Sequence, residues 1–346
     1  MSAANNNDRA AGRPGILVVA PAWVGDMVMA HSLIQVLRAD RPAARITLLA
    51  PPATLPLAAF MAEVDGGVEQ PVGRGRLGLA DRWRLGRSLR AARHDWAILL
   101  PNSLKSALAP WWAGIPRRTG YRREGRSVLL TDPRRLDKQR LPRTVDRFVA
   151  LGRPANAAPG EVPWPRLTVP AGAAEEAQTA LHLAAPADPL LVLCPGAEYG
   201  PAKRWPPASF AAVAAHHRRV TGGAVWVLGG PGDRDAADAV AAAVPGAVSL
   251  AGRTTLAQAV ALMSLAHAVV TNDSGLMHVA AALDRPLVGV FGSSSPEMTP
   301  PLSHRARVVS LGLACSPCFE RVCPLGHTDC LNRLDPQRVI AALPGS

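Results

Sequence analysis

A turn that combines an acid, a hydroxyl and a glycine stands between two apolar runs in VVTNDSGLMHVAAALDRP. The run Ala268–Thr271 is followed by Asn272–Gly275 and then by a helix-like segment, Leu276–Leu283. The N-terminus of a helix has unpaired N–H groups and a positive dipole end, which suit a phosphate. His278 lies one turn beyond Ser274 and can face the same ligand. An ordinary helix cap explains the same residues, so the turn alone does not decide between the two.

A second stretch, CPGAEYGPAKRWP, also follows an apolar run and places Lys203 and Arg204 beside glycines. Two cations in a glycine-rich loop suit a diphosphate and the charge that it develops as it leaves. The GxxxxGK[ST] spacing is missing, which argues against ATP hydrolysis. We expect Trp205 to be a packing residue.

Acidic residues stand at two further turns that follow apolar runs. Asp26, in VGDMVM, either caps a helix or acts as a general base, and Gly25 beside it permits close approach of a ligand to the backbone. In GGPGDRD, Asp233 and Asp235 resemble the metal-binding DxD of one class of glycosyltransferases. The helix dipole accounts for two acids in a first turn, and we favour that interpretation. The GxGxxG spacing of nicotinamide and flavin sites is absent.

Four cysteines are clustered in CSPCFERVCPLGHTDC, at positions Cys315, Cys318, Cys323 and Cys330. In a cytoplasmic protein such a cluster indicates a metal more than disulfides. The CxxC pair suits a structural zinc, with His327 as a possible substitute ligand, but the later gaps do not match the usual two-pair ribbon. Reduced cysteines without a ligand are the competing interpretation. We expect the fifth, Cys194, to be a core residue.

Apolar runs that alternate with helix-like segments predict an α/β fold with two doubly wound sheets. The expected strands are Ile16–Ala20, Arg45–Ala50, Trp96–Leu100, Leu190–Cys194, Ala224–Leu228, Val248–Leu250, Ala268–Thr271 and Pro286–Phe291. The expected helices are Asp26–Arg38, Leu79–Arg93, Asn102–Trp112, Pro142–Leu151, Ala173–Leu183, Pro207–Thr221, Arg234–Val244, Thr255–Leu265 and Leu276–Leu283. Ligands of such sheets bind at the carboxyl ends of the strands, where each of these turns falls.

The pattern divides the chain into four parts. We expect a disordered tail at 1–14, an N-terminal domain at 15–165, a second domain at 171–330 and a C-terminal helix at 331–346 that packs back on the first domain. Arg117–Arg126 is expected to be a cationic loop. The polar N-terminus lacks the apolar region of a signal peptide, and no run nears the ~20 residues that span a bilayer, so we expect a cytoplasmic protein.

The net charge of +12 indicates an anionic partner. The segment 71–150 holds 19 Lys and Arg against six Asp and Glu. Three kinds of partner explain this charge: nucleic acid, an anionic membrane surface and an anionic substrate. A general enrichment of the composition in Arg explains it without any partner. No nucleic-acid-binding module is recognisable, so nucleic acid is the weakest of the three partners.

Together, WVGDMVM, PGAEYGPAKRWP and TNDSGLMHVAAALDRPLVGVFGSSSPE resemble the ADP-heptose:LPS heptosyltransferases, glycosyltransferase family 9. The resemblance covers about residues 15 to 340 in matching order, and PGAEYGPAKRWP is most similar to heptosyltransferase II. It implies a GT-B fold, in which two Rossmann-like domains face each other across a cleft that closes during catalysis. It also implies inverting, metal-independent transfer of L-glycero-D-manno-heptose from ADP-heptose to the first heptose of the inner core.

The resemblance also implies roles for individual residues. Asp26 would be the general base and Lys203 would stabilise the leaving diphosphate. The donor would be held by Gly196, Arg253, Thr254, Asp273, Ser274, Gly275 and His278. The acceptor side would include Trp23, Gly25, Lys105 and Arg122.

The implied acceptor carries Kdo and lipid A, so the expected location is peripheral, on the cytoplasmic face of the inner membrane, and the basic half suits its anionic lipids. The alternatives are heptosyltransferase I or III, or another nucleotide-sugar transferase. A non-catalytic nucleotide-sugar or nucleic-acid binding module with a zinc site is a third hypothesis. Catalysis requires no cofactor under the first hypothesis, and a zinc would be structural.

Overall fold

The computed structural model describes residues 12–72, 76–158 and 160–344. Most of the expected tail, residues 1–11, lies outside these ranges. The chain forms two compact units. The first contains the chain up to Ala22, Ser32–Leu141 and Asp146–Pro163, and the second contains Trp23–His31, Pro142–Val145 and the chain from Trp164 onward.

The first unit is built on a parallel sheet in the order β3-β2-β1-β4-β5-β6. Its strands are β1 Gly15–Val19, β2 Arg45–Ala50, β3 Gly66–Glu69, β4 Trp96–Leu99, β5 Arg117–Tyr121 and β6 Asp132–Arg134. Its helices are α1 Val24–Asp40, α2 Leu79–Leu89, α3 Leu104–Trp112 and α4 Thr144–Gly152, of which α1 and α4 begin in the second unit. Leu17 and Leu99 of the sheet share a core with Leu85 of α2 and Ala107 of α3.

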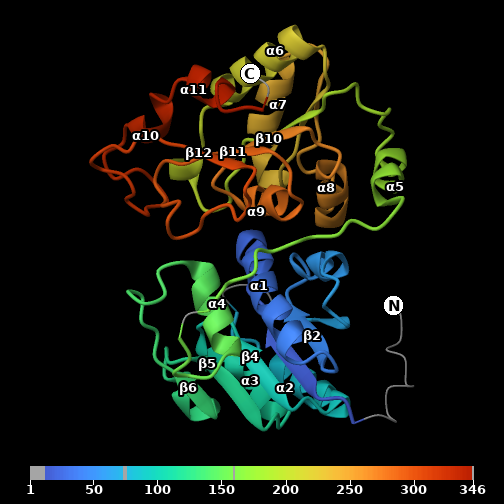
Figure 1. Ribbon diagram of the computed structural model, residues 1–346, viewed down its shortest axis with the longest axis vertical. Coiled ribbons are helices and arrows are strands. Elements are labelled where there is room, and N and C mark those ends of the chain that lie inside the picture. The colour runs from blue at the N-terminus through green and yellow to red at the C-terminus, as the bar shows by residue number, and fades with distance from the viewer. Residues whose placement is uncertain (1–11, 73–75, 159, 345–346) are drawn as a thin grey trace. The chain divides into compact units, whose positions relative to one another are not determined.

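The second unit repeats the same topology, in the order β12-β11-β10-β7-β8-β9 with every pair parallel. Its strands are β7 Leu191–Cys194, β8 Val225–Val227, β9 Ala247–Ser249, β10 Ala268–Asn272, β11 Leu287–Val290 and β12 Ala306–Val309. Its helices are α5 Ala173–Ala180, α6 Pro207–Thr221, α7 Arg234–Ala243, α8 Leu256–Met263, α9 Gly275–Ala282, α10 Asp329–Asn332 and α11 Pro336–Ile340. Figure 1 shows helices packed against each sheet.

The expected α/β class with two doubly wound sheets is confirmed, because each sheet reverses its strand order at a central switch point, between β1 and β4 and between β7 and β10. The prediction of a cationic loop over Arg117–Arg126 is wrong for its first half, which is strand β5. The C-terminal helix also differs from expectation: Val339, Ile340 and Leu343 lie in the core of the second unit. Among the described residues, no helix is long and apolar enough to cross a bilayer.

Candidate active site

The site begins at the switch point of the second sheet, where β7 and β10 run side by side. Thr271 of β10 is in register with Cys194 of β7. Both strands are fully buried, and β10 ends in the polar residues Thr271 and Asn272. The loop Pro195–Trp205 and the turn Asp273–Gly275 therefore leave the sheet next to each other, as the sequence predicts.

Asn272, which the sequence did not single out, joins the two segments. Its Oδ1 accepts a hydrogen bond from the N–H of Trp205 at 3.0 Å, and its Nδ2 donates to the carbonyl of Pro195 at 2.6 Å. Asn272 is fully buried, and a buried amide with both ends satisfied favours one arrangement over others. Trp205 is confirmed as a packing residue and donates through Nε1 to Leu334 at 3.1 Å.

Lys203 and Asp273, assigned from separate motifs, form an ion pair. Their Nζ and Oδ2 atoms are 2.5 Å apart, and the side chains are 17% and 5% exposed. Lys203 also lies over the ring of Tyr199, 5.0 Å from its centre. A cation that is largely shielded from water acts strongly on a nearby anion, so this pair is suited to contact a diphosphate.

The expected cap at the start of α9 is only partly present. Ser274 occupies the N-cap position, but its hydroxyl accepts no hydrogen bond from the helix. It lies instead 3.2 Å from the hydroxyl of Thr271. The side chain of Ser274 thus leaves the first N–H groups of α9 to another acceptor, which is the arrangement of an anion site.

The first turn of α1 packs directly on this anion site. A Cβ atom on Gly25 would lie 2.7 Å from Cδ2 of His278, and one on Gly275 would lie 2.7 Å from Cβ of Val24. Burial lowers the pKa of His278 to about 4, against the smaller opposing effect of Asp273. The imidazole is therefore neutral at physiological pH.

Gly25→Ala is expected to weaken donor binding and to lower stability by about 1–3 kcal/mol, because the new methyl group overpacks against His278. Gly232→Ala is the matched control, since a Cβ there meets nothing within 4 Å. Thermal unfolding and donor titration measure both effects. Equal behaviour of the two variants would show that the contact with His278 is dispensable.

Asp26 lies in the first turn of α1 and is partly exposed. Contacts group it, together with Trp23 and Gly25, with the second unit, although the resemblance assigns Trp23 and Gly25 to the acceptor side. The candidate base therefore lies on the same compact unit as Lys203 and Asp273.

Asp233 organises the neighbouring loops through its carboxylate. It accepts a hydrogen bond from the N–H of Gly230 at 2.9 Å and lies 3.5 Å from Nη2 of Arg204. A Cβ on Gly196 would lie 2.1 Å from Cγ of Asp233, so this glycine makes room for the carboxylate. These contacts support the helix-start interpretation of Asp233 over a DxD metal site.

Comparison with known proteins decides the family. The model of glycosyltransferase family 9 (heptosyltransferase) matches residues 82–329. The chain belongs to glycosyltransferase family 9. It is 44% identical to lipopolysaccharide heptosyltransferase 2 of Escherichia coli over 95% of this chain and 97% of that protein. It is 45% identical to lipooligosaccharide heptosyltransferase 2 of Haemophilus influenzae, over 86% of this chain and 88% of that protein.

The solved structure of E. coli ADP-heptose LPS heptosyltransferase II superposes with a TM-score of 0.84, at 41% identity, covering 95% of this chain and 97% of that one. The chain is thus a glycosyltransferase with the GT-B fold. The family resemblance and the enzyme class expected from the sequence are confirmed.

Arg253 and Thr254 of this family 9 enzyme follow β9, which is separated from β7 by β8. Arg253 is exposed and donates through Nη1 to the carbonyl of Ser249 at 3.2 Å. These two residues lie apart from the switch point, so their contact with a donor stays a prediction.

The two predicted acceptor-side cations of the first unit, Lys105 in α3 and Arg122 just after β5, lie near segments that are tied together. Fully buried Arg126 donates through Nε to Tyr121 at 2.9 Å and through Nη2 to Asn102 at 3.2 Å. It thereby joins the segment before Arg122 to the segment before Lys105. Burial lowers the pKa of Arg126 to about 10, so it remains charged at physiological pH.

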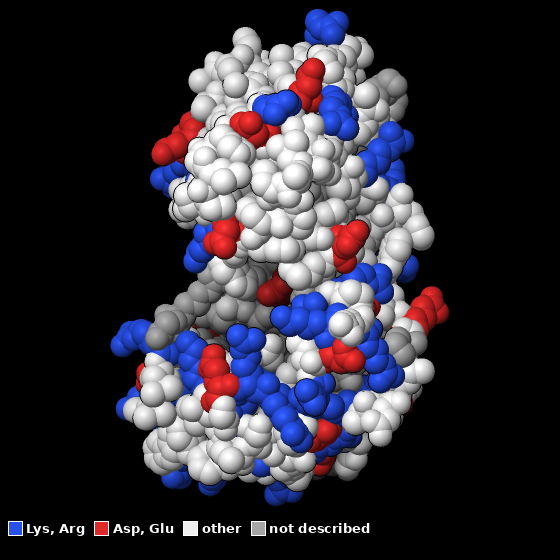
Figure 2. All heavy atoms as spheres, turned by 90° about the vertical axis from the view of Figure 1, so that its left-hand side faces the viewer, with Lys and Arg blue, Asp and Glu red and all other residues white. Residues whose placement is uncertain are grey.

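Lys and Arg side chains gather over one face of the first unit (Figure 2). Three arginines of the basic segment are buried: Arg82, Arg126 and Arg134. Exposed ones such as Arg87, Arg122 and Arg135 remain available to an anion. The basic surface expected from the sequence is therefore present, but it is smaller than the count of cations indicates.

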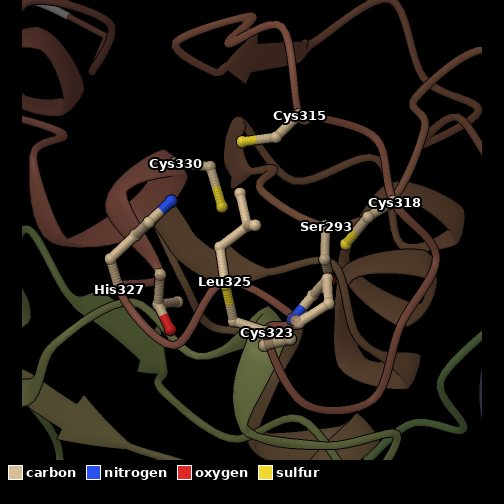
Figure 3. Close-up of a pocket in the computed structure, with 10 residues that line it drawn as sticks. Ser293, Cys315, Cys318, Cys323, Leu325, His327 and Cys330 are labelled. Carbon is tan, nitrogen blue, oxygen red and sulfur yellow. The ribbon is translucent and has the colours of Figure 1, made fainter.

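The four clustered cysteines line one small pocket, to which Ala202, the neighbour of Lys203, also contributes (Figure 3). Backbone hydrogen bonds, the largest from Thr328, lower the pKa of the Cys323 thiol. Burial, followed by the neighbouring thiols, raises that of Cys330. The core assignment of Cys194 is confirmed, because it is buried.

Proposed function

We propose that this enzyme transfers L-glycero-D-manno-heptose from ADP-heptose to the first heptose of the lipopolysaccharide inner core. The observation that carries the proposal is the Lys203–Asp273 pair beside the uncapped start of α9. The chain that holds this pair is 41% identical to the E. coli ADP-heptose LPS heptosyltransferase II of known structure. A cation, a carboxylate and free N–H groups match the diphosphate and sugar of such a donor.

In the proposed reaction, Asp26 removes the proton of the acceptor hydroxyl, and that oxygen attacks the anomeric carbon. The bond from this carbon to the diphosphate breaks on the opposite side, which inverts the configuration. Lys203 stabilises the charge on departing ADP, together with the N–H groups of α9. The transfer requires no metal, because the chain itself supplies the cation.

His278 and the neighbouring residues Ser274 and Gly275 hold the donor. Gly196, Arg253 and Thr254 border it from the other loops. On the first unit, cations including exposed Arg122 and half-buried Lys105 attract the Kdo carboxylates and lipid A phosphates of the acceptor. The enzyme works in the cytoplasm against the anionic inner leaflet.

Purified enzyme incubated with ADP-heptose and inner-core acceptors tests the proposal by mass spectrometry. Transfer is expected to an acceptor that carries one heptose and not to one that carries only Kdo. Transfer to the heptose-free acceptor would instead indicate heptosyltransferase I, and transfer only to a two-heptose acceptor would indicate heptosyltransferase III. Activity should not depend on added divalent metal ions, and NMR of the product should show the inverted anomer.

A further inference from the structure

Four of the chain's five cysteines surround one space in the second unit. Cys315, Cys318, Cys323 and Cys330 all line the same pocket, and every thiol is free. Figure 3 shows their side chains around this space. Cys194 is absent from the lining.

Three of these thiols lie on a segment with little regular structure, and the fourth, Cys330, lies in α10. Between the end of β12 at Val309 and the start of α10 at Asp329, all residues are described and none is in a helix or strand. Two hydrogen bonds tie it to the loop that follows β11, from the hydroxyl of Ser316 to Gly292 and from the N–H of Phe319 to Ser293 at 2.7 Å. A segment of this kind is typical of sites in which bound metal supplies the missing stabilisation.

The same segment packs on the loop that carries Lys203. The hydroxyl of Tyr199 donates to the carbonyl of Phe319 at 2.7 Å, and Nε of Arg321 donates to the carbonyl of Tyr199 at 2.7 Å. The N–H of Ala202 donates to the carbonyl of Arg321 at 3.1 Å, and Ala202 also lines the cysteine pocket. Whatever orders the cysteine segment therefore also orders the backbone next to Lys203.

We propose that Cys315, Cys318, Cys323 and Cys330 bind one zinc ion, which fixes their segment against the Tyr199–Lys203 loop. Four thiolates are a ligand set that zinc accepts and that excludes magnesium and calcium. As they are placed in the described part of the chain, no three His, Cys, Asp or Glu side chains are arranged to hold a metal ion. Binding therefore entails rotation of the thiols about their Cα–Cβ bonds toward the space that they line.

His327 lines the pocket but is committed elsewhere. Its Nδ1 atom accepts a hydrogen bond from the N–H of Asp329 at 2.9 Å and lies 3.6 Å from the carboxylate of the same residue. The four thiols complete a tetrahedral set without it. His327→Gln is therefore a control within the pocket, and Cys194→Ala is a control for a thiol outside it.

The first test is the metal content of the full chain, purified without a metal-affinity tag and measured by mass spectrometry for zinc and iron. We expect about one zinc per chain, retained in both controls and reduced below about 0.2 in Cys318→Ser and Cys323→Ser. Zinc below about 0.2 in the unaltered protein would overturn the proposal. A full equivalent of iron in its place would retain the site and overturn the choice of metal.

Because the serine variants can fail to fold, a second measurement uses the unaltered chain. A chelator should release the zinc and make four additional thiols reactive to a thiol reagent. Trypsin cleavage after Arg321, which is exposed, should then accelerate at least about tenfold, since the segment loses its cross-link. Unchanged thiol reactivity would refute zinc ligation, and unchanged cleavage would refute the proposed ordering of the loop.

Discussion

Replacing Asp26 with asparagine is expected to lower kcat by about 10²–10⁴-fold while donor affinity changes by less than about twofold. Asparagine keeps the size and the hydrogen-bonding oxygen of the side chain but cannot accept the acceptor's proton. Asp26 is in the first turn of α1, where a carboxylate also interacts with the helix dipole. The measurement is steady-state kinetics with a one-heptose acceptor, beside a binding titration with ADP-heptose.

Loss of the dipole interaction gives a small, separable effect. It should cost at most about 1 kcal/mol in the free energy of unfolding, and melting curves of the variant measure it directly. If Asp26 only stabilised the start of α1, the decrease in kcat would be no larger than this small loss of stability explains. A variant with near-normal turnover would therefore remove Asp26 from the proposed mechanism.

Lys203→Met is expected to reduce kcat/KM by about 10²–10³-fold, because the variant loses the positive charge that stabilises the leaving diphosphate. It should also lower the free energy of unfolding by roughly 2–3 kcal/mol, since Asp273 is 5% exposed and would lose its ion-pair partner. Arginine at the same position keeps the charge but is longer and planar, so Lys203→Arg should restore stability more than activity.

The double variant Lys203→Met, Asp273→Asn separates the two effects. It removes the unpaired buried charge, so stability should return to within about 1 kcal/mol of the unaltered protein while turnover stays low. Recovery of turnover in the double variant would mean that Lys203 acts only by neutralising Asp273. Continued instability would mean that the packing of the two side chains contributes more to stability than their ion pair does.

The sequence predicts the sheets well because a buried parallel strand needs a continuous apolar run. Strand β2 was predicted with its observed bounds and β7 within one residue. The edge strands β3, β6 and β12 were missed, since they are short and only partly buried. β5 was also missed, because Arg117 and Arg118 give it a loop-like composition and only pairing with β4 makes it a strand.

The sequence predicts those parts of the candidate site that lie within a single turn or loop. It does not predict the contacts between residues that are far apart in the chain. The Lys203 loop and the Asp273 turn were found from composition and motif. The link between Pro195 and Trp205 through Asn272 joins residues 67 and 77 positions apart. The contact of Gly25 with His278 spans still more of the chain. Such contacts leave no periodic signal in the sequence.

The amide of Asn272 has a consequence for the cost of binding. By holding Pro195 and Trp205 at once, it pins both ends of the loop between them, and the loop loses much of its freedom during folding. The loop therefore loses its conformational entropy during folding and not on ligand binding, so more of the favourable contact energy contributes to ligand affinity. Asn272 thus contributes to ligand affinity through this loop, without contact with a reacting atom.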